Sequence, residues 1–184
     1  MTAEDSLQFV LSKLDQHEIH YMVTGSFASN VHGVPRTTYD VDIVIETSQR
    51  SLEGFLQSLG EGFYVDPETA REAMANRTMF NLIHLETGFK VDLIVKKDRP
   101  FSEQEFPRRE KISFLGEPCW FATAEDVILA KLEWSKLSES EKKFVDALNI
   151  AKVQGGRLDA GYLKKWAREL GVQESMDRLL QELV

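Results

Sequence analysis

Two short apolar stretches of the chain each carry acidic residues among branched aliphatic ones. The first is DVDIVIE, which begins at Asp40, and the second is KVDLIV, which begins at Lys90. Runs rich in Val and Ile that alternate at a period of two predict β-strands. An acid inside such a strand is costly unless it is paired or binds a cation. The fold of this chain must therefore bring these acids to an exposed edge, to a partner or to a site.

The spacing of the acids favours a shared site. Side chains two positions apart in a strand project from the same face, so Asp40 and Asp42 lie on one side, with about 6 to 7 Å between their Cα atoms. Carboxylates this close repel one another unless a cation lies between them. If the strand that carries Asp92 lies alongside, three carboxylates converge, and Mg²⁺ prefers such oxygen ligands. The alternatives are two solvated acids at a strand end and, for Asp92, a salt bridge to Lys90 or a nearby arginine.

A glycine and a serine follow the β-rich run of residues 19–24 and precede a small, apolar segment that predicts a helix. Glycine lets the backbone approach a phosphate closely, and a helix N-terminus offers unpaired N–H groups. The hydroxyl of Ser26 can add a hydrogen bond to a phosphate oxygen. Gly25 and Ser26 also fit an ordinary turn with an N-cap. Their position about fifteen residues before the acid pair favours the phosphate-binding interpretation.

Hydrophobic periodicity and capping residues predict the remaining elements. Residues 96–109 are charged and contain two prolines, so we expect a loop there. The expected elements are a helix through Leu7 to Leu14, started by a Thr2–Asp5 capping box, a strand at 19–24, a helix at 26–33, a strand at 41–45, helices at 48–59 and 67–76, a hairpin of 78–86 and 89–95, one or two strands at 111–122, and four helices that begin at Thr123 and end near Leu183.

This order predicts an α+β fold, in which a mixed sheet flanked by helices is followed by a C-terminal helical part. We expect residues 1–122 to form the α/β domain and residues 123–184 to form a helical region packed on it. Trp120, Trp134 and Trp166 are on apolar faces and are expected in the core. The pair Arg108 and Arg109 is expected to be solvated at the surface.

Charge and composition restrict the partners. The net charge of −8 argues against a protein that wraps nucleic acid by itself, because such binding depends on neutralising phosphates. Residues 127–170 nevertheless carry nine Lys or Arg against six Asp or Glu, so this part suits a triphosphate or RNA, or simply has solvated helix faces. The acidic remainder suits a cation or a cationic acceptor.

The sequence also predicts a cytoplasmic location. No apolar run approaches the roughly 20 residues that span a bilayer, and the acidic N-terminus does not have the pattern of a signal peptide. A lone cysteine, Cys119, cannot form an internal disulfide. No membrane association is expected.

Three motifs together resemble the DNA polymerase β-type nucleotidyltransferase superfamily. They are GSFAS from Gly25, GVPRTTYDVDIVI from Gly33, and KVDLIV from Lys90. The match is most similar to two small branches, the antibiotic nucleotidyltransferases and the abortive-infection type toxins. The segment TAEDVILAKLEW also resembles a helix of those toxins with its lysine at Lys131, and KKFVDALNI resembles a later helix with its acid at Asp146.

The resemblance implies a nucleotidyltransferase-like fold and a Mg²⁺- or Mn²⁺-dependent transfer of a nucleoside monophosphate from a nucleoside triphosphate to a hydroxyl. The acceptor is a small molecule, a protein or an RNA end. The alternative is a catalytically reduced binding protein that acts through a protein partner, for example as a toxin–antitoxin component. The implied metal-binding and catalytic residues are Asp40, Asp42 and Asp92, and the implied nucleotide-binding residues are Gly25, Ser26, Arg36, Thr37 and Lys131.

Overall fold

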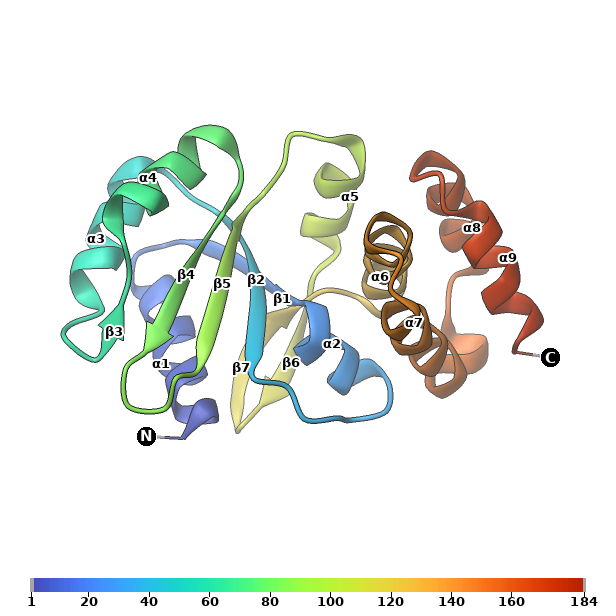
Figure 1. Cartoon of the computed structure of the whole chain (residues 1–184), viewed down its shortest axis with the longest axis horizontal. Coiled ribbons are helices and arrows are strands. Elements are labelled where there is room, and N and C mark those ends of the chain that lie inside the picture. Colours follow the sequence, from blue (N-terminus) through green and yellow to red (C-terminus); the bar gives the residue numbers. More distant parts are fainter. Residues whose placement is uncertain (1, 184) are drawn as a thin grey trace.

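The computed structural model describes residues 2–183, and within them seven strands form one sheet surrounded by nine α-helices (Figure 1). The strands are β1 (His20–Thr24), β2 (Asp40–Glu46), β3 (Phe63–Tyr64), β4 (Met79–His84), β5 (Lys90–Val95), β6 (Glu110–Phe114) and β7 (Glu117–Phe121). The helices are α1 (Ala3–Gln16), α2 (Gly25–His32), α3 (Gln49–Ser58), α4 (Pro67–Asn76), α5 (Pro100–Arg108), α6 (Ala124–Ser138), α7 (Glu141–Gln154), α8 (Ala160–Glu169) and α9 (Gln173–Gln181), with a 3₁₀ turn η1 (Gly155–Arg157) after α7.

The sheet is mixed, with strand order β3-β4-β5-β2-β1-β7-β6. At its centre β2 pairs antiparallel with β1 and parallel with β5. The predicted hairpin is confirmed, since β4 pairs antiparallel with β5. A second hairpin joins β6 to β7. The two acid-bearing strands, β2 and β5, are therefore direct neighbours.

Each face of β2 has its own role. Val41, Ile43 and Ile45 are fully buried in the core. The alternate positions, which include Asp40 and Asp42, are only partly buried. Helices α1, α3 and α4 lie on one side of the sheet, and α2, α6 and α7 lie on the other (Figure 1). The period of two thus separates an apolar face from a face on which acids are accessible.

Most helices begin where a side chain caps them. Thr2 and Asp5 form the expected capping box at α1. At the starts of four further helices, a side-chain oxygen of the N-cap residue accepts a hydrogen bond from a backbone N–H in the first turn; these N-cap residues are Ser48, Asp66, Thr123 and Asp159. Helix α2, like α5, α7 and α9, has no such bond, since Thr24 at its N-cap makes no side-chain hydrogen bond. The first N–H groups of α2 therefore lack a side-chain acceptor.

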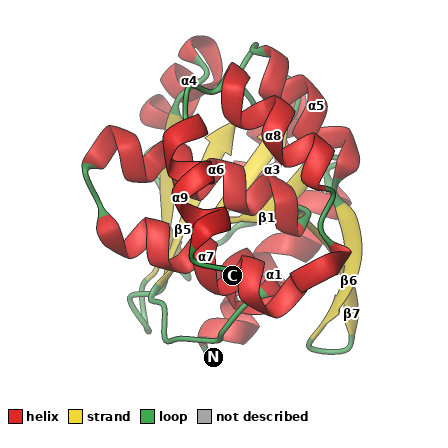
Figure 2. Cartoon of the chain, turned by 90° about the vertical axis from the view of Figure 1, so that its right-hand side faces the viewer, coloured by secondary structure: helices red, strands yellow, loops and turns green. Residues whose placement is uncertain are grey.

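The C-terminal helices pack against the rest of the chain. Figure 2 shows α6 to α9 in front of the sheet when the molecule is turned by 90°. Trp166 of α8 contacts Phe101 of α5, with ring centroids 5.3 Å apart. The buried apolar cluster runs from Leu7 in α1 to Leu179 in α9. The structure is therefore the α+β arrangement that the sequence predicted. Among residues 2–183 there is no helix with the length and apolarity needed to cross a bilayer.

The expected loop at 96–109 is wrong, because residues 100–108 form α5. Pro100 occupies the first turn, where its missing N–H would have had no partner in any case. Phe101 and Phe106 are buried and hold the helix against the core. Tertiary packing thus stabilises a helix in a segment whose prolines and charges predicted a loop.

Two predictions about side-chain environment are also wrong. Trp134 is 52% exposed, whereas Trp166 is 6% exposed and packed as expected. Arg108 is not simply solvated, since its guanidinium pairs with the buried Asp126 at 3.2 Å. Arg109 packs over the ring of Trp120. Long cationic side chains can cover apolar surface in this way.

Candidate active site

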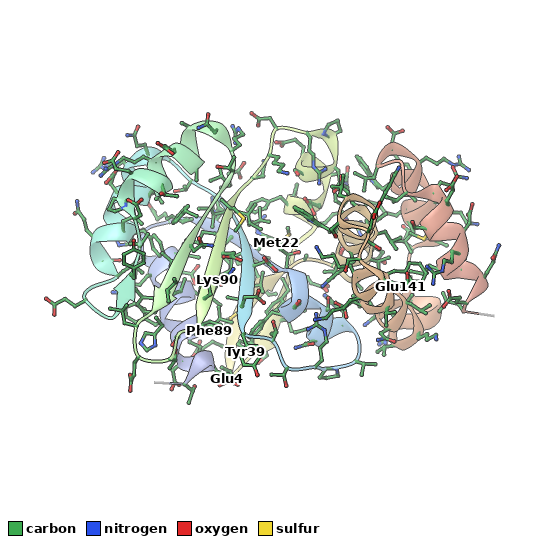
Figure 3. All side chains as sticks on the ribbon, in the orientation of Figure 1. Glu4, Met22, Tyr39, Phe89, Lys90 and Glu141 are labelled. Atoms are coloured by element: carbon green, nitrogen blue, oxygen red, sulfur yellow. The ribbon has the colours of Figure 1, made fainter. Side chains whose placement is uncertain are left out.

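The register of β2 and β5 brings the predicted acids side by side. Asp42 lies directly opposite Asp92, and Asp40 lies opposite Lys90. Because the strands are parallel and in register, these side chains emerge from the same face of the sheet. Figure 3 shows Tyr39 and Lys90 where β2 and β5 begin, with Glu141 across on the helical side.

A cavity of about 380 Å³ opens on this face, within the size range of small-molecule sites. Six of the predicted site residues line it: Gly25, Ser26, Asp40, Asp42, Asp92 and Lys131. A second cavity of about 370 Å³ shares Ser26, Asp40, Lys131 and Lys143 with the first, and it carries the other two predicted residues, Arg36 and Thr37. The eight residues therefore lie around two adjoining cavities.

Gly25 is in contact with Asp42. Its φ of +62° is in the left-handed region, and a Cβ built on it would lie 1.9 Å from Oδ2 of Asp42. No other residue type fits there without moving the carboxylate. The uncapped start of α2 is thereby held against the acid pair, so a phosphate bound at α2 would lie next to Asp42.

Each of the other two carboxylates has its own partner. The Thr38 hydroxyl donates to Oδ1 of Asp40 at 2.9 Å. Asp92, which is 5% exposed, accepts a hydrogen bond from the Asn81 amide and pairs with Nζ of Lys90 at 2.8 Å. The sequence did not indicate Thr38 or Asn81. The salt bridge to Lys90, which the sequence left open, is present.

The electrostatics of Asp42 reflect its neighbours. Burial raises the pKa of this carboxyl, and the charges of Asp92 and Asp40 raise it further, while Lys131 and Lys90 lower it. A bound cation relieves the repulsion that neighbouring carboxylates exert on a charged carboxyl such as that of Asp42. The arrangement therefore suits a divalent ion.

A cationic network forms the border between the two cavities. Asp146 of α7 accepts from Nη2 of Arg36 at 3.0 Å and from Nζ of Lys131 at 3.0 Å. Nη2 of Arg36 also donates to Oγ of Ser26 at 3.0 Å. Lys131 is only 8% exposed. Segments far apart in the chain, the 33–39 loop, α6 and α7, thus place two cations beside the Gly25–Ser26 turn.

Asp146 keeps these cations in place as a charged group. Burial raises its pKa, but the hydrogen bonds from Arg36 and Lys131 outweigh burial and leave the pKa below its ordinary value. The hydrogen bonds that Arg36 donates to Asp146 also raise the pKa of the Arg36 guanidinium. Asp146 and Arg36 therefore form an ion pair at neutral pH, which preorganises the guanidinium for an anionic ligand.

The donors fit Mg²⁺ or Mn²⁺ in kind, since carboxylate oxygens are the ligands that hard divalent cations prefer. Over residues 2–183, no three His, Cys, Asp or Glu side chains already stand close enough together to form a metal cluster. The partners of Asp40 and Asp92 account for this, because Thr38 and Lys90 hold these carboxylates individually. A metal ion bound to Asp92 would have to displace the ammonium group of Lys90 from this carboxylate.

Comparison with protein-family models gives no match, and comparison with curated protein sequences gives none either. Comparison of the structure does give matches, and they show that the chain has the nucleotidyltransferase fold. The solution structure of the antibiotic-resistance factor ANT(2'')-Ia is similar at a TM-score of 0.61 with 13% identity, over 97% of this chain and 96% of that one. An antigenic nucleotidyltransferase-like protein from Paracoccidioides brasiliensis has a TM-score of 0.60 with 16% identity, over 97% and 92%. The lincosamide antibiotic adenylyltransferase LnuA, with lincomycin bound, has a TM-score of 0.56 with 14% identity, over 81% and 96%.

Proposed function

We propose that this protein is a divalent-metal-dependent nucleotidyltransferase that moves a nucleoside monophosphate from a nucleoside triphosphate to an acceptor hydroxyl. One observation carries the proposal: Asp42 and Asp92 stand opposite each other on adjacent parallel strands, in a cavity that also contains the Gly25–Ser26 turn. Metal-assisted phosphoryl transfer needs such carboxylates beside a phosphate-binding backbone.

The triphosphate is assigned to the border of the two cavities. Asp146 accepts hydrogen bonds from Arg36 and Lys131 and so holds both cations beside this border. The guanidinium of Arg36 also donates to the hydroxyl of Ser26. The second cavity adds Lys142 and Lys143, so cations surround the place where three phosphates would lie. Thr37 lines the same cavity.

In the reaction, the acceptor oxygen attacks the α-phosphorus, the bond to the β-phosphate oxygen breaks, and pyrophosphate leaves. Asp92 takes the proton of the acceptor hydroxyl, and Asp40 and Asp42 are the residues that would hold Mg²⁺ or Mn²⁺. When bound, the metal neutralises phosphate charge and lowers the pKa of the attacking hydroxyl. Arg36 and Lys131 stabilise the charge that develops on pyrophosphate.

An antibiotic or other small molecule with a hydroxyl is the acceptor class that the similar structures suggest. One of them holds ANT(2'')-Ia with adenylyl-2''-tobramycin, and another holds LnuA with lincomycin. The part of the first cavity beyond the acids offers both signs of charge, with Lys97 and Glu105 on its wall. A protein or an RNA end remains an alternative acceptor for the assay below.

Thermal denaturation with ATP and Mg²⁺ tests the binding half of the proposal. We expect the wild type to be stabilised by the two ligands together, and Asp42→Asn to lose that stabilisation. Incubation with labelled nucleoside triphosphates and a cell lysate tests transfer, because the label then moves to metabolite, protein or RNA. A wild type that neither binds nor transfers any of the four nucleotides contradicts the proposal.

A second candidate is a protein that binds nucleotide without transferring it and acts through a protein partner. The pairing of Asp92 with Lys90 favours it, because an acid held in this way is not free to take a proton. The two candidates separate in the same assay. Metal-dependent stabilisation by ATP without any labelled product supports the second candidate, whereas a labelled product excludes it.

A further inference from the structure

One tryptophan of the chain is not used for packing. Trp134 of α6 is 52% exposed and lines the first cavity, together with Val127 and Ala130 of the same helix. Lys131 lies three residues earlier, so the indole and the ammonium group project from one side of α6 about one turn apart. Trp134 thus presents about half of its surface at the wall of the first cavity, where a ligand can reach the ring.

Trp134 also adjoins the cationic region. Nζ of Lys143 lies 4.9 Å from the centre of its ring. Lys143 lines both cavities, so this side chain connects the indole with the group that includes Arg36 and Lys131. A ligand that spans from the cations to the indole would have several negative charges at one end and a flat π-system at the other. A nucleoside triphosphate has this shape.

We infer that the indole of Trp134 is the stacking surface for the nucleobase of the triphosphate. This inference rests on the proposed function and adds the base subsite to it. Bases stack on aromatic side chains whatever their hydrogen-bonding edge, because every base has a π-face. Without nucleotide, the Lys143 ammonium covers the ring. With nucleotide, Lys143 turns to the phosphates and the base replaces it on the ring.

The inference predicts a broad base preference. Glu133, the polar residue of the cavity wall that precedes Trp134 in the sequence, is already paired. It accepts hydrogen bonds from the guanidinium of Arg99 at 2.6 Å and 2.9 Å. Stacking area then dominates, so purine triphosphates bind more tightly than pyrimidine triphosphates. The difference is expected to be a few-fold and not a strict selection.

The test compares a ligand with a base and a ligand without one. Calorimetry with Mg²⁺ measures the dissociation constants of ATP and of inorganic tripolyphosphate for the wild type, Trp134→Ala and Trp134→Phe. Trp134→Ala is expected to weaken ATP binding about tenfold and to leave tripolyphosphate binding within about twofold. Trp134→Phe is expected to recover most of the ATP affinity, because a phenyl ring still stacks. Leu137→Ala, an exposed apolar position on the same helix, is the matched control and is expected to bind both ligands normally.

Three outcomes overturn the inference. Unchanged ATP affinity in Trp134→Ala shows that the base lies elsewhere, and an equal loss for ATP and tripolyphosphate shows a structural role. Failure of Trp134→Phe to recover ATP binding excludes stacking. These results leave the proposed function intact, whereas a wild type that binds neither ligand overturns the proposed function itself. Thermal denaturation of each variant establishes that it is folded.

Discussion

At the scale of single residues, Gly25 is where backbone conformation and site chemistry meet. Its positive φ is available at low cost only to glycine, and the carboxylate of Asp42 occupies the space of a Cβ. A side chain at this position would displace the carboxylate or the start of α2. Both changes affect the place assigned to the triphosphate.

We predict that Gly25→Ala destabilises the fold by about 1–3 kcal/mol, because strain in the left-handed region adds to the clash with Asp42. It should also abolish stabilisation by Mg²⁺ and ATP. Urea denaturation and thermal shift measure the two effects. Gly88→Ala is the matched control, since Gly88 has a φ of +68° with nothing within 4 Å of its Cβ position. Gly88→Ala should cost stability but keep the nucleotide response. If both variants keep the response, the contact with Asp42 does not matter for binding.

The charge of Asp42 is expected to lower the free energy of unfolding of the protein without ligands. Partial burial of this carboxyl raises its pKa, and the like charges of Asp92 and Asp40 raise it further. We predict that Asp42→Asn raises the free energy of unfolding without ligands by about 1 kcal/mol, since removing charge from a functional site commonly stabilises a protein. Denaturation in EDTA measures this. Glu46→Gln, at the exposed end of the same strand, should instead destabilise slightly because it loses its pair with Lys96. A less stable Asp42→Asn would contradict the prediction.

At the scale of elements, the strands and caps were predictable because their causes are local. The period of two in β2 separates a buried face from an accessible one, whereas in β5 Asp92 is buried together with Val91 and Leu93. Thr123 and Asp159 start α6 and α8 through bonds within three residues. Convergence of the three acids required that the strand of Asp92 lie beside the strand of Asp40 and Asp42, and β2 and β5 do pair.

The partners of the site residues were not predictable in the same way. Arg36 meets Asp146 across 110 positions of sequence, and Asn81 reaches Asp92 from the neighbouring strand. Such contacts depend on how elements pack, which periodicity does not encode. The same holds for Trp134, since an apolar helical position predicts burial until the neighbouring elements are placed.

Helix α5 buries a titratable side chain, Glu105, at the wall of the first cavity. Burial raises the pKa of Glu105 to about 7, and the charge of Asp126 adds to the rise while Arg99 opposes it. A raised pKa means that the folded state holds the proton more tightly than the unfolded state. The stability contributed by this group is therefore complete below about pH 4.5 and is lost as the pH rises to about 7.

We predict that Glu105→Gln is more stable than the wild type at pH 8, by about 1–3 kcal/mol, and that the difference shrinks at pH 5. Glutamine can keep the hydrogen bond from Ser102 without carrying a charge. Urea denaturation at the two pH values measures the change. Glu103→Gln on the same helix is the control, since Glu103 is exposed and loss of its pair with Lys96 should give no gain in stability at pH 8. An equal effect at both pH values would contradict the raised pKa.

At the scale of the whole molecule, the sheet and the C-terminal helices share one apolar core. The division at residue 122 separates regions by composition, yet buried residues continue from Phe121 through Val127 to Met176. Polar contacts also cross the division, and the pair of Arg36 with Asp146 joins the 33–39 loop to α7 at the proposed triphosphate site. The proposed site is thus built from both regions.

We therefore predict that the chain unfolds in one cooperative transition, in which the calorimetric enthalpy equals the van't Hoff enthalpy. ATP with Mg²⁺ should move this whole transition to higher temperature, because a ligand that binds only the native state stabilises every part that unfolds with the site. Asp146→Asn should lower the transition temperature and also reduce the shift caused by ATP, since it loosens both cations. Scanning calorimetry measures the number of transitions, the shift of the transition temperature with ATP and Mg²⁺, and the effect of Asp146→Asn on both. Two resolved transitions, only one of which responds to ATP, would show that one region alone binds the nucleotide and that the helical part is a separate folding unit.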